Sequence, residues 1–297
     1  MTGRIFDCFT FFNELEVLEA RLHELYEFVD YFVIVESTVT FKNHKKPLFF
    51  QDNKDKFTPF LDKILHVVVY DSPDEGSPWV KEYHQRNAIR RGLPELDDSD
   101  IIIISDVDEI VRSETVAILR SISGYAVLDM SLHFYFFNMV YATSGWRHAF
   151  AVTGRYFETI RDLSDPRKSP QAFFDDFAGP KREILRAGWH FSYLGGAERI
   201  RTKVNAYSHT GELVDAINRE NAAEEMLRDG RWPNSPNVLR LSKIDENMPK
   251  YIRTNERQLM SAGLVKCPWD RIAELEALVD NQSEQLRRGR FRRLTVE

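Results

Sequence analysis

The chain has 297 residues and a formal net charge of −6, and 43% of its residues are hydrophobic. This size and composition predict one large α/β domain with a C-terminal extension, and the acidic balance argues against a nucleic-acid-binding protein. No apolar run approaches the roughly 20 residues of a membrane helix. The N-terminus has no leader pattern, and two distant cysteines fit a reducing compartment. We therefore expect a cytoplasmic protein without a transmembrane segment.

The first half of the chain alternates strand and helix patterns. Strands are predicted at residues 4–9, 31–37, 64–70, 100–105 and 125–137, and helices at residues 13–29, 78–93 and 113–122. In the first helix, leucines recur at the i, i+3, i+4 spacing that marks one helix face. Strands that alternate with helices predict crossover connections and a mostly parallel central sheet flanked by helices.

The second half has a weaker pattern. Residues 154–188 mix proline, glycine, charge and aromatics, and we expect a long loop region there. Such loops are uncommon unless they are functional. The chain is expected to be mainly helical from residue 197, with a turn-rich break at 229–238 and a final helix at 269–288. Five arginines between Arg287 and Arg293 predict either a solvated tail or a weak peripheral contact with anionic lipid.

The segment "IIIISDVDEI" changes abruptly from apolar to acidic at residue 106. Four consecutive isoleucines are typical of a central strand that is buried on both faces. Asp106, Asp108 and Glu109 then fall beyond its carboxyl end, where ligands bind in sheets of this kind. Because three carboxylates within four residues repel one another, we expect positive charge among them.

Three interpretations of these acids compete. In the first, they only cap the following helix, since carboxylates near a helix start accept its free N–H groups. A phosphatase-like nucleophilic aspartate also follows a strand, but no small hydroxyl residue follows here. The third interpretation is a Mn²⁺ or Mg²⁺ site that holds a nucleotide-sugar diphosphate, because hard oxygen ligands suit these ions.

Two further segments favour the third interpretation. In "AGWHFSYLGGAERIRTK", His190 is a candidate metal ligand, and Lys203, or Arg199 and Arg201, are candidates to meet the diphosphate. The alternative for His190 is a satisfied structural histidine. In "YHQRNAIRRGL", Arg86 and Asn87 are candidates to contact the nucleotide-sugar, the alternative being an exposed basic helix face.

Together these residues resemble glycosyltransferase family 17, which includes an enzyme that adds the bisecting N-acetylglucosamine to N-glycans. The resemblance runs from about residue 5 to residue 232. It is carried by "FNELEVLEARLHELYEFVDYFVIVES", by the D-x-D-E segment and by the G-W-H-x-S segment, in which Glu198 and Lys203 match. Because the sequence lacks a membrane anchor and a disulfide-rich setting, it is most similar to the soluble microbial branch.

The resemblance implies a nucleotide-diphospho-sugar fold of the GT-A type, an inverting mechanism and a UDP-sugar donor, with UDP-N-acetylglucosamine expected first. It implies a glycosyltransferase domain over residues 1–235, with a nucleotide-sugar half at about 1–125 and an acceptor and metal half at about 126–235. A helical extension would follow over residues 236–297. The acceptor is expected to be a glycan or glycoside.

Roles for individual residues follow from this expectation. Asp106, Asp108 and His190 are predicted to bind the metal, with Lys203 and Arg86 on the phosphates. Glu36 and Ser37 are predicted to face the uridine or ribose, since the second strand ends there. For the general base that inversion requires, Glu198 is the first candidate, followed by Asp175 and Asp176. The rival from another class is a non-catalytic nucleotide-sugar or glycan-binding protein on the same fold.

Overall fold

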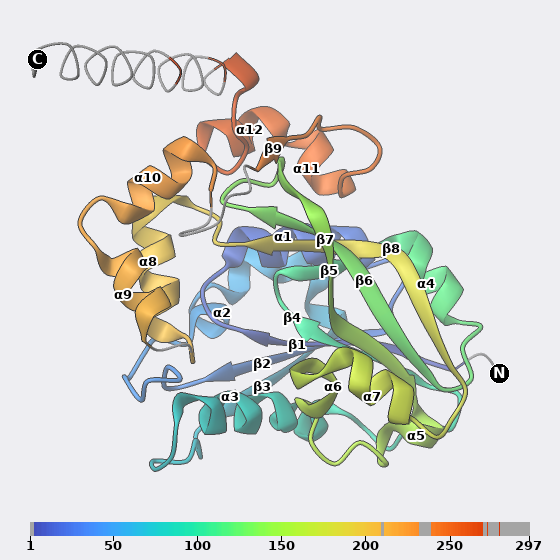
Figure 1. Ribbon diagram of the computed structural model, residues 1–297. Coiled ribbons are helices and arrows are strands. Elements are labelled where there is room, and N and C mark those ends of the chain that lie inside the picture. Colours follow the sequence, from blue (N-terminus) through green and yellow to red (C-terminus); the bar gives the residue numbers. More distant parts are fainter. Residues whose placement is uncertain (1–2, 209–210, 232–238, 270–271, 273–278, 280–297) are drawn as a thin grey trace, which may run out of the picture.

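A computed structural model of the protein describes residues 3–208, 211–231, 239–269, 272 and 279. Its centre is a curled sheet in the order β3-β2-β1-β4-β7-β6-β8-β5, with β9 paired to β7 (Figure 1). The strands are β1 (Ile5–Phe11), β2 (Tyr31–Ser37), β3 (Ile64–Val69), β4 (Ile101–Asp106), β5 (Glu109–Val111), β6 (Tyr125–Phe134), β7 (Met139–Thr153), β8 (Lys181–Ser192) and β9 (Arg240–Leu241).

The sheet is mixed but mostly parallel. β3, β2, β1 and β4 run parallel, as the alternating pattern predicts. The 15-residue strand β7 then pairs antiparallel with both β4 and β6, while β6 and β8 are parallel. The sequence pattern did not predict β7. The α/β class and the mostly parallel, helix-flanked sheet are confirmed.

Helices cover both faces of this sheet (Figure 1). The first half contains α1 (Leu15–Leu25), α2 (Phe49–Asp52), α3 (Pro78–Asn87) and α4 (Ser113–Leu119), with the 3-10 helices η1 (Lys54–Lys63) and η2 (Ala88–Gly92). The second half contains α5 (Gly154–Phe157), α6 (Asp165–Lys168), α7 (Pro170–Asp176), α8 (Gly196–Ala206), α9 (Glu212–Asn218), α10 (Ala222–Asp229), α11 (Lys250–Thr254) and α12 (Glu256–Ser261).

Alternation along the parallel strands divides the core into two layers. Ile101 and Ile103 of β4 pack in one apolar cluster with leucines of α1. Ile102 and Ile104 pack in a second cluster with Ile89 of η2. Because successive strand residues point to opposite faces, Ser105 continues the α1 face and Asp106 the α3 face.

Arg21 of α1 is the central polar group of the α1 layer. Its side chain and that of Asp7 in β1 are both fully buried and form an ion pair. The guanidinium also donates to the backbone carbonyls of Asp106 (2.8 Å) and Glu109 (2.9 Å) and to Ser105 Oγ (2.7 Å). One buried cation therefore fixes the turn that carries the acids.

The predicted long loop at residues 154–188 is wrong. This region holds α5, α6, α7 and the first half of β8. The three helices have four to seven residues, too short to show a helical repeat in the sequence. Phe173, Phe174 and Phe177 anchor α7 on the ring of Tyr125, with centroids 5.1–6.4 Å apart.

The helical character predicted from residue 197 is confirmed by α8, α9 and α10. Beyond them, Tyr251, Ile252 and Leu259 pack in a cluster with Val17 of α1 and Trp189 of β8. Most of the predicted turn-rich break and of the final helix, and all of the arginine-rich tail, lie outside the described residues. In the described part of the chain, no helix has the length and apolarity needed to cross a bilayer.

We expect Arg21→Met to lower the free energy of unfolding by about 3–5 kcal/mol, because it leaves Asp7 as an uncompensated buried charge. Urea denaturation followed by circular dichroism measures this. Arg219→Met is the control, since Arg219 forms a solvent-exposed pair with Glu225 and such pairs contribute about 0–1 kcal/mol. Equal stability of both variants would contradict the role given to Arg21.

Candidate active site

Asp106 lies at the carboxyl end of β4, between two arginines. Its Oδ1 accepts hydrogen bonds from Arg86 of α3 (2.7 Å) and Thr10 of β1 (3.0 Å). Its Oδ2 accepts one from Arg167 of α6 (2.6 Å). Burial alone would raise the pKa of this carboxyl, but the two arginines outweigh it and hold the pKa well below its ordinary value. Asp106 is therefore an anion at neutral pH.

Glu109 shares Arg167 with Asp106. Arg167 Nη1 donates to Glu109 Oε2 (2.7 Å), and Trp146 of β7 donates its indole N–H to Oε1. Glu109 Oε2 also accepts the backbone N–H of Asp106 (2.8 Å), which closes the turn between β4 and β5. Burial opposes the charge of Arg167, yet the two carboxylates raise its pKa above the usual range. The positive charge expected among the acids is thus supplied by protein side chains.

Asp108 points to a different group of partners. Its Oδ2 accepts a hydrogen bond from Lys203 of α8 (2.6 Å), and His190 Nε2 of β8 lies 3.5 Å from Oδ1. Burial would raise the pKa of Asp108, but Lys203 and His190 lower it below its ordinary value. His190 Nδ1 is buried without a hydrogen-bond partner among the described residues. His190 is therefore not the satisfied structural histidine of the alternative interpretation.

The helix-cap interpretation of the acids is also wrong. Strand β5 separates them from α4, and the backbone N–H of Ser113 at the start of α4 bonds to Glu24 (3.2 Å). Asp106 and Asp108 instead face open space. They line a cavity of about 530 Å³ together with Arg86, Arg167 and Lys203. Anionic and cationic groups thus alternate around a volume large enough for a small ligand.

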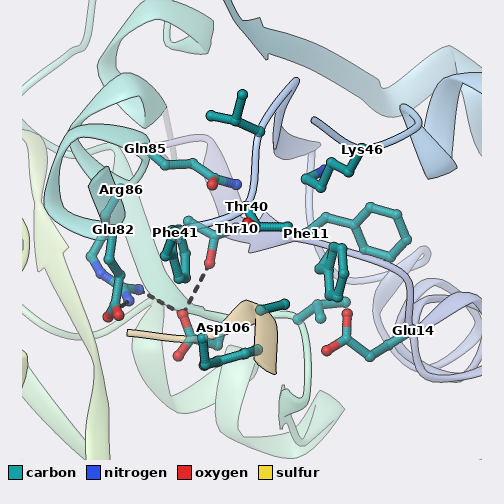
Figure 2. Close-up of a pocket in the computed structure, with 15 residues that line it drawn as sticks. Thr10, Phe11, Glu14, Thr40, Phe41, Lys46, Glu82, Gln85, Arg86 and Asp106 are labelled. Carbon is teal, nitrogen blue, oxygen red and sulfur yellow. Dashed lines mark hydrogen bonds and ion pairs between the residues drawn. The ribbon is translucent and has the colours of Figure 1, made fainter. Parts of the chain in front are cut away.

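A second pocket, lined in part by phenylalanines, adjoins this cavity at the ends of β1 and β2 (Figure 2). Asp106 and Arg86 border both spaces. The walls include Phe11, Phe41 and Lys46, whose Nζ is buried without a hydrogen-bond partner among the described residues. Burial lowers the pKa of Lys46. Thr40, Gln85 and Arg86 also line this pocket, which therefore offers aromatic walls and several polar groups.

The predicted metal ligands are only partly brought together. Asp108 and His190 approach each other, while Asp106 is held by Arg86 and Arg167. In the described part of the chain, no three His, Cys, Asp or Glu side chains are grouped as a metal site. Mg²⁺, however, is often held by one or two carboxylates together with substrate phosphates. The carboxylate of Asp108 and the imidazole of His190, which lies beside it, fit such an open site, in which Lys203 now supplies the positive charge.

The predicted donor-binding residues have different surroundings. Arg86 is buried and directed at Asp106. The alternative interpretation, an exposed basic helix face, is therefore wrong for this residue. Asn87 donates to Asp162 (2.8 Å) and accepts the N–H of Leu163 (3.0 Å), which ties α3 to the segment before α6. Asn87 thus helps to place Arg167.

Glu36 and Ser37 are both buried at the end of β2. The carboxylate of Glu36 accepts the backbone N–H groups of Phe50 (2.9 Å) and Gln51 (3.4 Å) at the start of α2. Ser37 Oγ bonds to Ser72 Oγ (3.1 Å). Neither side chain lines the two cavities, so their contact with a nucleoside stays a prediction.

The structure does not bring Glu198 to the acids. Glu198 is exposed in the first turn of α8, whereas Ile200 and Lys203 are buried on the other side of that helix. Residues two apart lie about 200° around a helix, so Glu198 points away when Ile200 points inward. Among the neighbouring arginines, Arg199 bonds to Glu16 and Arg201 to Glu224.

Asp175 and Asp176 are likewise exposed and line neither cavity. They belong to α7, which packs on Tyr125. Tyr125 and Ile102 both pair with Val152, so Tyr125 lies at the beginning of β4 rather than at its acidic end. The roles predicted for Glu198, Asp175 and Asp176 stay predictions without support from this geometry.

Several residues of the site were missed from the sequence, and four of them contact the acids or their partners. They are Thr10, Trp146, His148 and Arg167, of which the last three come from β7 and α6. The only signal in the sequence was the Trp146-Arg147-His148 run, where polar and aromatic residues lie just before a buried strand end. Arg167 lies in a charged segment that looks like an ordinary surface loop.

The site can be compared with known proteins. A family model of glycosyltransferase family 17 matches residues 1–228. The chain belongs to glycosyltransferase family 17. It is 28% identical over 130 residues to the β-1,4-mannosyl-glycoprotein 4-β-N-acetylglucosaminyltransferases of Rattus norvegicus and Homo sapiens.

That similarity is distant and partial. The matched segment covers 41% of this chain and 24% of each relative, so the chain spans about a quarter of the relatives' length. Membership of family 17 nevertheless implies a nucleotide-sugar donor. The resemblance inferred from the sequence motifs is thereby confirmed at the level of the family.

The charge pairs of this site predict a pH dependence of stability. Because the pKa values of Asp106 and Asp108 are lower in the folded protein, unfolding takes up protons near the ordinary carboxyl pKa of about 4. The stabilisation is present above that pH and is lost as the pH falls. We expect urea midpoints to drop between pH 5 and pH 3.

Asp106→Asn should make this pH dependence shallower and lower the stability at pH 7. Asp98→Asn is the control, because the side chain of Asp98 is 71% exposed. Parallel pH curves for wild type and Asp106→Asn would contradict the assignment of the buried charge to Asp106.

Proposed function

We propose that this protein is an inverting glycosyltransferase of the GT-A type that transfers a sugar from a UDP-sugar to a glycan or glycoside. N-acetylglucosamine is the first candidate for the transferred sugar. The observation that carries the proposal is the cavity at the carboxyl end of β4, where the D-x-D acids meet Arg86, Arg167 and Lys203. Open α/β sheets bind ligands at this edge. The donor sugar of the distant relatives supports N-acetylglucosamine as the first choice.

In this proposal, the donor spans the two adjoining spaces. The nucleobase enters the pocket of Figure 2, between Phe41 and Lys46. The diphosphate lies beside Arg86, which borders both spaces, and Lys203. These cations stabilise the charge that develops on the leaving diphosphate, because fixed charges in a partly buried site act strongly. Asp106 orients Arg86 and Arg167.

Mn²⁺ or Mg²⁺ belongs to the proposal as well. Asp108 and His190 would hold the ion, with its remaining ligands drawn from the diphosphate and water. When bound, the ion would act as a Lewis acid that neutralises the leaving diphosphate. Lys203, which pairs with Asp108 in the structure, would then be free to bind the phosphate oxygens.

Release of UDP from UDP-N-acetylglucosamine tests the reaction. With Mn²⁺ and p-nitrophenyl β-D-mannoside as the acceptor probe, we expect UDP formation above the rate without acceptor, and its loss in EDTA. A coupled assay for UDP measures both. Tight UDP binding with no UDP formed from any UDP-sugar, over a panel of glycosides, would instead indicate a nucleotide-sugar-binding protein.

Asp108→Asn tests the ion site without turnover. We expect it to weaken Mn²⁺-dependent UDP binding at least about tenfold in calorimetry, because a charged ligand is replaced by a neutral one. Asp98→Asn, remote from the cavity, should bind UDP as the wild type does. If Asp108→Asn retains the wild-type affinity in Mn²⁺, the ion is held elsewhere.

A further inference from the structure

His148 of β7 is a titratable side chain of the cavity that takes no part in the proposed donor and metal sites. It lines the 530 Å³ cavity beside Arg167 and Trp146. Its ring lies against the ring of Trp146, with centroids 4.2 Å apart. Trp146 in turn bonds to Glu109, and on its other side contacts His190 at 4.2 Å. His148 is thus held next to the acids without being paired to them.

The hydrogen bonds of His148 define its tautomer. Nδ1 lies 2.6 Å from the backbone carbonyl of Arg167. Because a carbonyl oxygen only accepts, Nδ1 carries the proton, and Nε2 of the neutral ring has a lone pair. Nε2 has no hydrogen-bond partner within the described ranges. Burial lowers the pKa of His148 below 6.5, and Arg167 lowers it further, so the neutral ring predominates at pH 7.

The other basic groups of the cavity are engaged. Asp106 is bound by two arginines, and Asp108 by Lys203. Glu82 of α3 accepts hydrogen bonds from Arg86 (3.1 Å) and Ser208 (2.7 Å). His190 faces Asp108, where the proposed ion would bind. Among the described residues that line the cavity, His148 is therefore the neutral base whose Nε2 is not engaged, and a hydroxyl group that enters the cavity can meet it there.

We propose that His148 is the general base that deprotonates the acceptor hydroxyl. This inference rests on the proposed glycosyltransferase function. The acceptor oxygen forms a bond to the anomeric carbon and gives its proton to Nε2 of His148. The bond between the anomeric carbon and the phosphate oxygen breaks, and its electron pair leaves with UDP. The imidazolium then returns its proton to solvent.

Carboxylates offset part of the cost that burial and Arg167 impose on this transient positive charge. Arg167 is the adjacent cation, but its guanidinium is bound by the carboxylates of Asp106 and Glu109 at 2.6–3.0 Å. Both carboxylates also stabilise protonated His148. The carbonyl of Arg167 keeps Nδ1–H in place throughout, so the ring does not need to turn between binding and proton transfer.

His148→Gln and His148→Ala test the proposal. We expect His148→Gln to lower kcat for transfer from UDP-N-acetylglucosamine to p-nitrophenyl β-D-mannoside at least about 100-fold, the usual scale of general-base catalysis. UDP affinity in Mn²⁺ should stay within about twofold in calorimetry. Added imidazole should raise the kcat of His148→Ala at least about tenfold, which a purely structural role of the ring would not produce.

His84→Gln is the matched control, a partly exposed histidine of α3 that pairs with Asp71 on the surface, and it should retain wild-type turnover. Turnover of His148→Gln above a tenth of the wild type would overturn the proposal, as would failure of imidazole to restore a folded His148→Ala. Loss of turnover in Glu198→Gln with retention in His148→Gln would return the role to Glu198. Wild-type protein that forms no UDP refutes the proposed function itself, which separates the two failures.

Discussion

Neutralisation of the acids at the end of β4 is the constraint on which the rest of the site depends. Asp106, Asp108 and Glu109 follow a buried strand, and the cations that pair with them are distant in sequence. Their partners come from elsewhere: Arg86 from α3, Arg167 from α6 and Lys203 from α8. Unpaired carboxylates at this depth would be strongly destabilising. The acids therefore require that three separate elements converge on one sheet edge, and that convergence creates the cavity.

The alternation of β4 decides which cation serves which purpose. Ser105 points to α1, where Arg21 is sealed from solvent and bonded to backbone carbonyls and Asp7. Asp106 points to the other face, where its side chain is 23% exposed. Adjacent residues of β4 therefore face a buried structural cation on one side of the sheet and the cations that line the cavity on the other. The framework of the turn is fixed independently of whatever binds in front of it.

Much of the parallel half of the fold was predictable from the sequence because its signals are local. The strand at residues 31–37 and the apolar run of β4 are recognised by their own residues, and the acids mark the ligand-binding edge. Strand β7 was missed, since Gly145 and several polar residues interrupt its apolar pattern. Trp146 and His148, which lie on this strand, were therefore missed as well. The role of Arg167 could not be predicted either, because its pairing with Asp106 joins residues 61 positions apart and has no signal in the local sequence.

The exposed position of Glu198 could not be read from the motif either. A family motif places Glu198 five residues before Lys203, and motif proximity suggested a shared site. In a helix, however, five residues correspond to about 140° of rotation, so the side chains of Glu198 and Lys203 point in different directions. Lys203 lies against Asp108 while Glu198 is exposed.

His148 lies on β7, a strand of the antiparallel side of the sheet. Arg86 and Lys203 lie on the helices α3 and α8 instead. In the proposed reaction, the cations that bind the donor and the base therefore come from different elements around one cavity. An inverting displacement would require the acceptor to approach the anomeric carbon from the face opposite the leaving group.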